Sequence, residues 1–361
     1  MLPCALVVSL GGVAMSQTTH LVGPGGYPQI TSAIAVASPG DIILVQPGTY
    51  GMFSTTIGLT IRATVPGASF ATAFGFGGSV IQPPPGQTVH LVGMQLGLTV
   101  VTSGRATFDG CTIDAQSGQL AVINAAVHVQ DCLLKSYAPS IPAWNPVPAL
   151  QATNAEVTVI DSTIVGADMV PFLTPGVAID LIGSTFRGSH LTVQAGHGSP
   201  AMPAVRADAA SSVWISDSTI DCDPAGCPIA ATNGRHDRCT LTPNCSSLAA
   251  GFVLGIDRPQ PLRNGLLFTL HMNAQPNSAI GLFVDYSLAS SSYATLEQSL
   301  LLPPATAFSG GVFVADGTGY ATAAWVVPPG PAFVDRTVWF QAFAGPAFPL
   351  QASAIAGGVV R

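Results

Sequence analysis

A short motif with one interruption recurs along the chain. In "VTVIDSTIV" (157–165), apolar and polar residues alternate until Asp161, where one extra residue breaks the alternation before Ser162. The same pattern is found in "ATFDGCTID", "VHVQDCLLK", "IDLIGSTFR", "VWISDSTID" and "GRHDRCTLT". The residues after the break are Cys111, Cys132, Ser162, Ser184, Ser218 and Cys239, at intervals of 21, 30, 22, 34 and 21 residues. A repeat of this length predicts a solenoid whose longer intervals are absorbed by loops.

The alternation shows which side chains of each unit face inward. Side chains alternate across a strand, so the apolar residues five and three before the break position, and two after it, share the interior with the small Ser or Cys. The extra residue requires a bend, and Asp or Gly before the break tolerates the unusual backbone angles of a bend. Strands joined by such corners predict an all-β parallel β-helix in which coils stack ~4.8 Å apart. The last unit departs from the pattern at His236 and Arg238, as expected where a solenoid ends.

The N-terminal segment "YPQITSAIAVASPGDIILVQPGTYG" (27–51) strengthens this prediction. It resembles the entry segment of the right-handed parallel β-helix (pectin-lyase-like) family. The resemblance implies a capping helix over Ile30 to Ala37, a first coil in "GDIILVQPGTY", and a solenoid over residues 20–248. Enzymes of that family cleave acidic polysaccharides, either as lyases with carboxylate-bound calcium and an Arg or Lys base, or as hydrolases with paired Asp residues.

The repeat stops near residue 250. Residues 250–361 contain short alternating segments separated by Pro, Gly and Asn, with Trp325 and Trp339 as large core candidates, which predicts a small β-sandwich. The closing "RTVWFQAFAGPAFPLQASAIAGGVV" resembles a C-terminal module of secreted or surface bacterial proteins, which implies a location and not a reaction.

Composition narrows the partners and the location. Charged residues make up 8% of the chain, against roughly 25% in an average soluble protein, which disfavours a helix-rich cytosolic enzyme. A net charge of −7 without a basic cluster argues against nucleic acid as a partner. No apolar run approaches the ~18 residues of a membrane span. Residues 1–16 end in Ala14-Met15-Ser16 and resemble a signal peptide without its basic start, so we expect a secreted or cell-surface protein.

Six cysteines follow Cys4, and an even number in a secreted chain favours disulfides. Cys111 and Cys132 share one column, where either a bridge or two interior thiols would fit. The four later cysteines are predicted to form two disulfides in the terminal loops; a zinc site with His236 is the alternative, but its spacing fits no zinc module. These four are Cys222, Cys227, Cys239 and Cys245. We expect no metal and no cofactor.

The candidate binding residues come from an outward-facing column. Four residues before each break stand Thr107, His128, Thr158, Asp180, Trp214 and Arg235. Trp214 between Asp180 and Arg235, with Asp237 in the last unit, could stack a sugar ring and bind its hydroxyl or carboxylate groups. The alternative is that a long loop in the 34-residue interval covers Trp214.

Signs of catalysis are weak. Gly196-His197-Gly198 matches a triplet of polygalacturonases, but their accompanying Asn-Thr-Asp, Asp-Asp and Arg-Ile-Lys motifs are missing. Lys135 and Arg187 belong to a column of alternating charges and are interpreted as members of surface ion pairs, not as a catalytic base. We therefore assign no catalytic residue and predict a non-catalytic polysaccharide-binding or adhesion scaffold whose partner is a polysaccharide or cell-surface glycan. The alternative is a polysaccharide lyase or glycoside hydrolase that acts on acidic polysaccharide.

Overall fold

The computed structural model describes residues 17–360 except for 72–77, 115–117, 137–146, 169–174, 223–226, 245, 252, 258–261, 289–292, 297, 328, 331–332, 334–336 and 346–348. The predicted signal peptide therefore lies outside the described residues and stays a prediction. Within the described part, no helix has the length and apolar character needed to cross a membrane.

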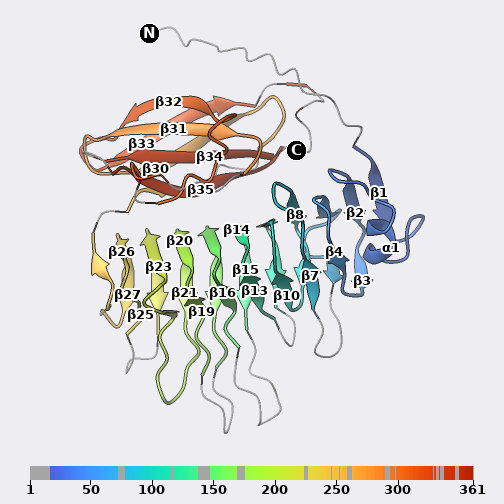
Figure 1. The fold of residues 1–361 in the computed structure, drawn as a ribbon, viewed down its shortest axis with the longest axis horizontal. Coiled ribbons are helices and arrows are strands. Elements are labelled where there is room, and N and C mark those ends of the chain that lie inside the picture. The colour runs from blue at the N-terminus through green and yellow to red at the C-terminus, as the bar shows by residue number, and fades with distance from the viewer. Residues whose placement is uncertain are drawn as a thin grey trace.

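Three long parallel sheets form the solenoid (Figure 1). Sheet A contains β1 (Thr19–Val22), β2 (Ile42–Val45), β5 (Thr60–Ala63), β8 (Thr88–Val92), β11 (Arg105–Asp109), β14 (Ala126–Gln130), β17 (Glu156–Ile160), β20 (Thr185–Ser189), β23 (Ser212–Ser216), β26 (Gly234–Asp237) and β28 (Ala249–Ala250). Sheet B contains β3 (Gly48–Tyr50), β6 (Ser69–Ala71), β9 (Gln95–Leu96), β12 (Thr112–Ile113), β15 (Leu133–Lys135), β18 (Thr163–Val165), β21 (Thr192–Gln194), β24 (Thr219–Asp221) and β27 (Thr240–Thr242). Sheet C contains β4 (Ser54–Thr55), β7 (Ser79–Ile81), β10 (Thr99–Val101), β13 (Leu120–Ile123), β16 (Leu150–Thr153), β19 (Ile179–Ile182), β22 (Val205–Ala207) and β25 (Ile229–Ala230). The prediction of a parallel β-helix is confirmed.

The helix α1 (Ile30–Ile34) closes the N-terminal end of the solenoid and buries Ile30 and Ala33. It begins where the sequence predicts and ends three residues earlier than expected. Behind it, one continuous core of inward-facing side chains follows the coils as far as Leu248.

The strands β8, β11, β14, β17 and β20 each lie between two tight corners, and both corners use a left-handed residue. Toward sheet B, this residue is Asp131 (φ 53°), Asp161 (φ 46°) or its equivalent; toward sheet C, it is Asn154 (φ 48°) or its equivalent. Asn, Asp and Gly adopt this conformation with the least strain. The small residue that follows explains the Ser and Cys of the repeat. The Ser162 hydroxyl donates to the carbonyl of Ile160 (2.7 Å) and accepts from the backbone N–H of Cys132 in the preceding coil (3.1 Å).

One unit of the predicted register is wrong. Ser184 is buried, but it lies at the sheet C to sheet A corner, where it accepts from the backbone N–H of Ala155. The residue equivalent to Ser162 in that coil is Leu191, whose N–H donates to Ser218 Oγ at 3.0 Å. Ser162 and Ser184 therefore occupy two different columns, at opposite ends of the sheet A strands.

We expect the hydroxyl groups of the corner serines to contribute measurably to the free energy of unfolding. Ser162→Ala leaves the buried N–H of Cys132 without its acceptor, so we expect the free energy of unfolding to fall by about 1–3 kcal/mol. Ser162→Cys, the residue found at two neighbouring corners, is expected to cost less. Chemical denaturation measures both, with Ser54→Ala at the exposed position of β4 as the control. An unchanged midpoint for Ser162→Ala would contradict this role of the hydroxyl.

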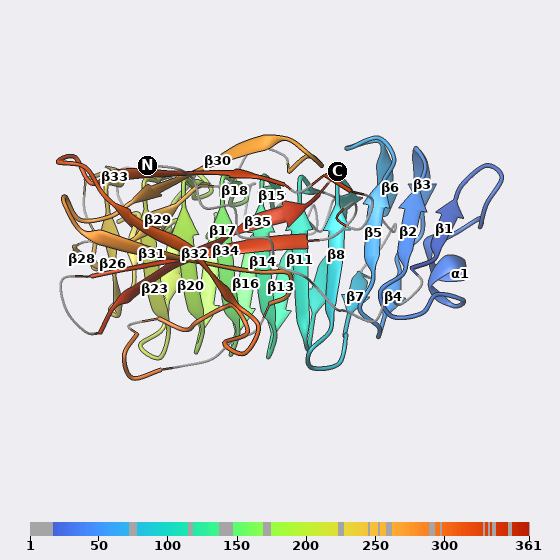
Figure 2. The ribbon, with the colours of Figure 1, turned by 90° about the horizontal axis from the view of Figure 1, so that it is seen from above.

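The remaining strands form the predicted sandwich. One antiparallel sheet has the order β29 (Gly255–Ile256), β30 (Leu267–Asn273), β33 (Tyr320–Val326); the other has the order β32 (Phe308–Val314), β31 (Ala279–Asp285), β34 (Thr337–Ala344), β35 (Gln351–Val359). The sandwich lies over the outer face of sheet A, with its strands running across those of the solenoid (Figures 1 and 2). Ile160 of the solenoid belongs to the core of the sandwich.

The cysteine predictions are correct in part: Cys111 and Cys132 are the two interior thiols of the second alternative, whereas Cys222 and Cys239 form no disulfide. Cys111, Cys132, Cys222 and Cys239 carry reduced thiols. The N–H of Cys111 donates to the sulfur of Cys132 at 3.3 Å, so this pair takes the same role in the corner as the serines do. Cys227 is disulfide-bonded, whereas Cys222 and Cys239 carry thiols, so at most one of the two predicted disulfides is formed. Cys245 lies outside the described residues.

Candidate functional site

The register of sheet A changes the predicted binding column. β20 pairs with β23 so that Arg187 is the neighbour of Trp214, and β26 places Arg235 on the other side of Trp214. Asp180 does not belong to this column. It lies on β19 in sheet C and forms a bidentate ion pair with Arg206 (2.8 and 2.9 Å). The expectation that Trp214 lies between Asp180 and Arg235 is therefore wrong: it lies between two arginines.

The sandwich covers most of this column. Thr107, His128, Thr158 and Arg187 are at most 3% exposed. Trp214 is half-buried, and Arg235 is exposed. The predicted alternative of a cover over the column is thus correct in part, although the covering residues come from the sandwich module and not from a loop of the repeat.

A cavity of ≈110 Å³ remains where the cover ends. Its residues come from two parts of the chain that are about 80 or more positions apart. They are Thr185, Arg187 and Trp214 of sheet A, with Tyr293, Leu296, Gln298 and Ser299 of the segment between β31 and β32. Gln298 Oε1 accepts from the N–H of Ala352 (2.8 Å), and the N–H of Leu350 donates to the carbonyl of Thr295 (2.8 Å). These bonds hold the segment against the sandwich.

Arg187 is the charged side chain of the cavity. Its Nη2 lies 3.1 Å from Glu156 Oε1 in an ion pair, and none of its three guanidinium nitrogens has a hydrogen-bond partner among the described residues. Burial lowers the pKa of Arg187, and the adjacent Glu156 opposes this shift. A buried guanidinium with free N–H groups is costly unless another acceptor reaches it.

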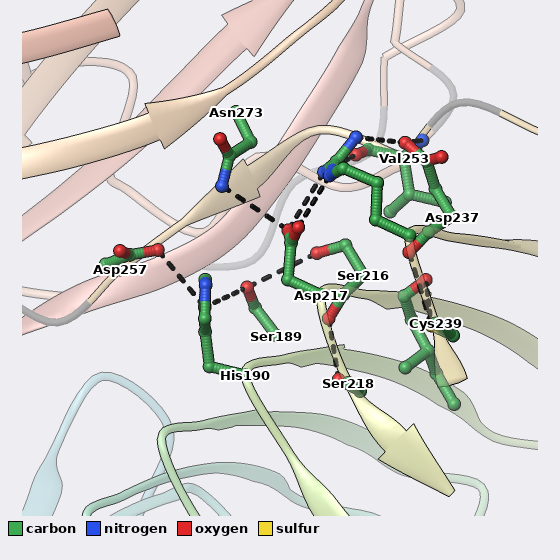
Figure 3. Close-up of polar contacts among 12 residues, drawn as sticks. Ser189, His190, Ser216, Asp217, Ser218, Asp237, Cys239, Val253, Asp257 and Asn273 are labelled. Atoms are coloured by element: carbon green, nitrogen blue, oxygen red, sulfur yellow. Dashed lines mark hydrogen bonds and ion pairs between the residues drawn. The ribbon is translucent and has the colours of Figure 1, made fainter. Parts of the chain in front are cut away.

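Asp237 belongs to a different cluster, at the junction of solenoid and sandwich (Figure 3). Arg238 donates to Asp217 at 2.6 and 2.9 Å, to Asp237, and to the carbonyl of Val253 at 3.2 Å. Although burial lowers the pKa of Arg238, the bonds to Asp217 outweigh it and the pKa is raised. The cluster connects the last coil to the sandwich, which is a structural role.

A second ion pair of this junction joins His190 Nδ1 and Asp257 Oδ1 at 3.1 Å (Figure 3). Burial raises the pKa of Asp257, and the neighbouring His190 lowers it. Asn273 of the sandwich reaches Asp217 of the solenoid at 3.5 Å. The two modules are thus joined by polar contacts near β23 and β26.

Among the described residues, few groups are placed for acid–base catalysis at the cavity. Within the described ranges, no group of three or more His, Cys, Asp or Glu side chains is placed to hold a metal ion. None of the residues that line the cavity carries a carboxylate. His197 lies at an exposed loop, where its N–H donates to Asp168 and its ring contacts Gln194.

Comparisons with known proteins add little to the fold. No protein-family model and no curated protein matches the chain. Among solved structures, an arginine-to-alanine mutant of AlyGC, a PL6 family alginate lyase, matches with 14% sequence identity and a TM-score of 0.29, over 68% of this chain and 39% of that chain. The chain thus spans well under half of the structure that it matches. Its own strand pairing is what defines it as a parallel β-helix with a C-terminal sandwich.

Of the seven residues that line the cavity, Trp214 is the one that the sequence predicts as a binding residue. The register error at Ser184 places Arg187 in a column of surface charges, whereas the strand pairing puts it next to Trp214. Tyr293 and Gln298 carry no motif, and only the docking of the sandwich brings them to Trp214.

Proposed function

We propose that this protein is a non-catalytic saccharide-binding scaffold, secreted or displayed at the cell surface, whose binding site is the cavity between sheet A and the sandwich. The observation that carries the proposal is the pairing of two aromatic side chains, Trp214 and Tyr293, around a cavity that also contains polar groups. Aromatic faces stack on sugar rings, and a few polar groups fix their orientation.

The competing function is a polysaccharide lyase, since Arg187 is buried and its pKa is lowered. A base must lose its proton, and Glu156 at 3.1 Å favours the protonated guanidinium. Arginine also stays protonated in nearly every protein environment. Binding without cleavage is therefore the better-supported function.

Trp214→Ala tests the proposal. On a glycan array, we expect retention of the best ligand to fall about tenfold, because a stacked aromatic contact and its buried area are worth on the order of 1–2 kcal/mol. Phe70→Ala removes an exposed aromatic side chain of sheet B and serves as the matched control. Equal retention by both variants would exclude the cavity as the site. Ultraviolet absorbance of unsaturated sugar ends, followed in the same samples, would instead reveal a lyase.

A further inference from the structure

The cavity is closed at one end and open at the other. Beyond Arg187, the outward column continues to Thr158 and His128, which are buried beneath Leu301 and Ile355 of the sandwich with only ≈20 Å³ of space between the layers. In the other direction, beyond Trp214, Arg235 and both residues of β28 are exposed. A chain that enters from the Arg235 side must therefore stop at Arg187.

The closed end is built for a negative charge. The three guanidinium nitrogens of Arg187 lack hydrogen-bond partners among the described residues, and the residue is 2% exposed. Its Nη2 forms an ion pair with Glu156 Oε1 at 3.1 Å, on the side away from Trp214 along sheet A. Arg235, two coils away at ~10 Å across Trp214, adds a second positive charge along the entry path. A planar guanidinium matches carboxylate and sulfate groups geometrically.

We propose that the cavity takes the terminal sugar unit of a glycan chain, with an anionic substituent of that unit at Arg187. This inference rests on the proposed function and specifies its ligand. Trp214 and Tyr293 contact the ring of the terminal unit, and the next units extend over Arg235 to solvent. Units in the middle of a chain are excluded, because the sandwich covers sheet A beyond Arg187.

Three monosaccharides test the charge requirement with the intact protein. Glucuronic acid, glucose 6-sulfate and glucose are compared by competition against a glycan that the array identifies. We expect at least one of the two anions to compete at least tenfold better than glucose, and their order distinguishes a carboxylate site from a sulfate site. Equal competition by glucose would overturn the inference and leave the proposed function standing. If no saccharide on the array binds to folded protein, the proposed function itself fails, and this inference fails with it.

Two double variants that keep the net charge test the role of Arg187 in binding the anionic group. Glu156→Gln with Arg187→Gln removes the buried ion pair and keeps the net charge; Arg105, which also interacts with Glu156, retains its bond to the Leu288 carbonyl at 2.6 Å. Asp180→Asn with Arg206→Gln removes an ion pair of sheet C, away from the cavity, and is the matched control. We expect the first variant to lose the preference for the anion and the second to keep it, with both folded by circular dichroism. An anion preference that survives in the first variant would overturn the assignment to Arg187, and should that variant fail to fold, the monosaccharide comparison still decides.

Chain ends are tested by shortening the ligand. An acidic polysaccharide and its partial hydrolysate are compared as competitors at equal total mass, because cleavage multiplies the ends and conserves the units. A terminal site predicts stronger competition by the hydrolysate. A site for internal units predicts equal or weaker competition, and this result would overturn terminal recognition.

Discussion

Trp339→Ala is expected to lower the free energy of unfolding by about 3–5 kcal/mol, the cost of truncating a large, fully packed aromatic side chain. Trp339 is 2% exposed and lies on β34, where it reaches from the sandwich to sheet A. Its ring stacks on His90 (6.4 Å between centroids) and meets His128 edge-on (5.0 Å). It also packs with Leu302 and Ile355 of its own module. The truncation therefore opens a space between the two modules as well as within one.

Calorimetric unfolding measures the loss, and small-angle scattering shows whether the sandwich separates from the solenoid. Trp325→Ala is the matched control, since Trp325 contacts Phe340 within the sandwich and is only partly buried. We expect this control to cost less and to leave the scattering profile compact. A loss below about 1 kcal/mol for Trp339→Ala would mean that the interface is loosely packed.

Acid is expected to weaken the same interface through His90. Burial lowers the pKa of His90 to about 4, so between that value and its ordinary pKa near 6.5 the unfolded chain binds a proton that the folded chain does not. Stability from this group is complete above pH ~6.5 and falls as the pH drops toward ~4, by up to about 3 kcal/mol. The centroid distance of 6.4 Å to Trp339 lies beyond the ~6 Å at which a cation gains from an aromatic face.

Denaturation between pH 7 and pH 4 measures this effect, with His90→Gln as the comparison. The pKa of Asp257 is raised mainly by burial, so its protonation stabilises the fold as the pH falls and works against His90. The difference between wild type and His90→Gln removes that opposing contribution. Parallel pH profiles for the two proteins would exclude His90 as an acid-sensitive contact.

The fold could be predicted from sequence because its local chemistry repeats. Several of the middle coils combine a left-handed residue with a small inward residue at a bend, and Asp161-Ser162 shows both in the sequence. The error at Ser184 has a physical cause. The corners at the two ends of a sheet A strand both combine a left-handed residue with a small residue, so Gly183-Ser184 resembles Asp161-Ser162 although it lies at the other corner.

The true corner of that coil breaks the usual pattern twice. His190 takes the left-handed conformation (φ 54°), and Leu191 replaces the small residue. The bulk of Leu191 fits because Gly188 stands at an inward position, where a Cβ would lie 2.5 Å from Leu191 Cδ1. A glycine at an inward position, three residues before a leucine, is the clue that could have placed this corner.

The cavity could not be predicted, because it depends on how two modules meet. The solenoid repeat specifies the outward position of Trp214 and nothing about its cover. The polar groups that position the sandwich, such as Asn273 and Asp257, follow no periodicity that a sequence shows. The predicted binding surface assumes that the outward column of sheet A is exposed, and the sandwich covers most of that column.

The buried thiols of Cys111 and Cys132, in neighbouring coils, can report local opening of the solenoid. Burial is the main cause that raises the pKa of Cys132 well above its ordinary value, and Cys111 beside it is equally enclosed. Alkylating reagents consume the thiolate, so these two sites react only when their coils part. The rate of alkylation, followed by mass spectrometry, therefore measures how often the middle coils open locally. It reports this opening separately from any movement of the sandwich relative to the solenoid.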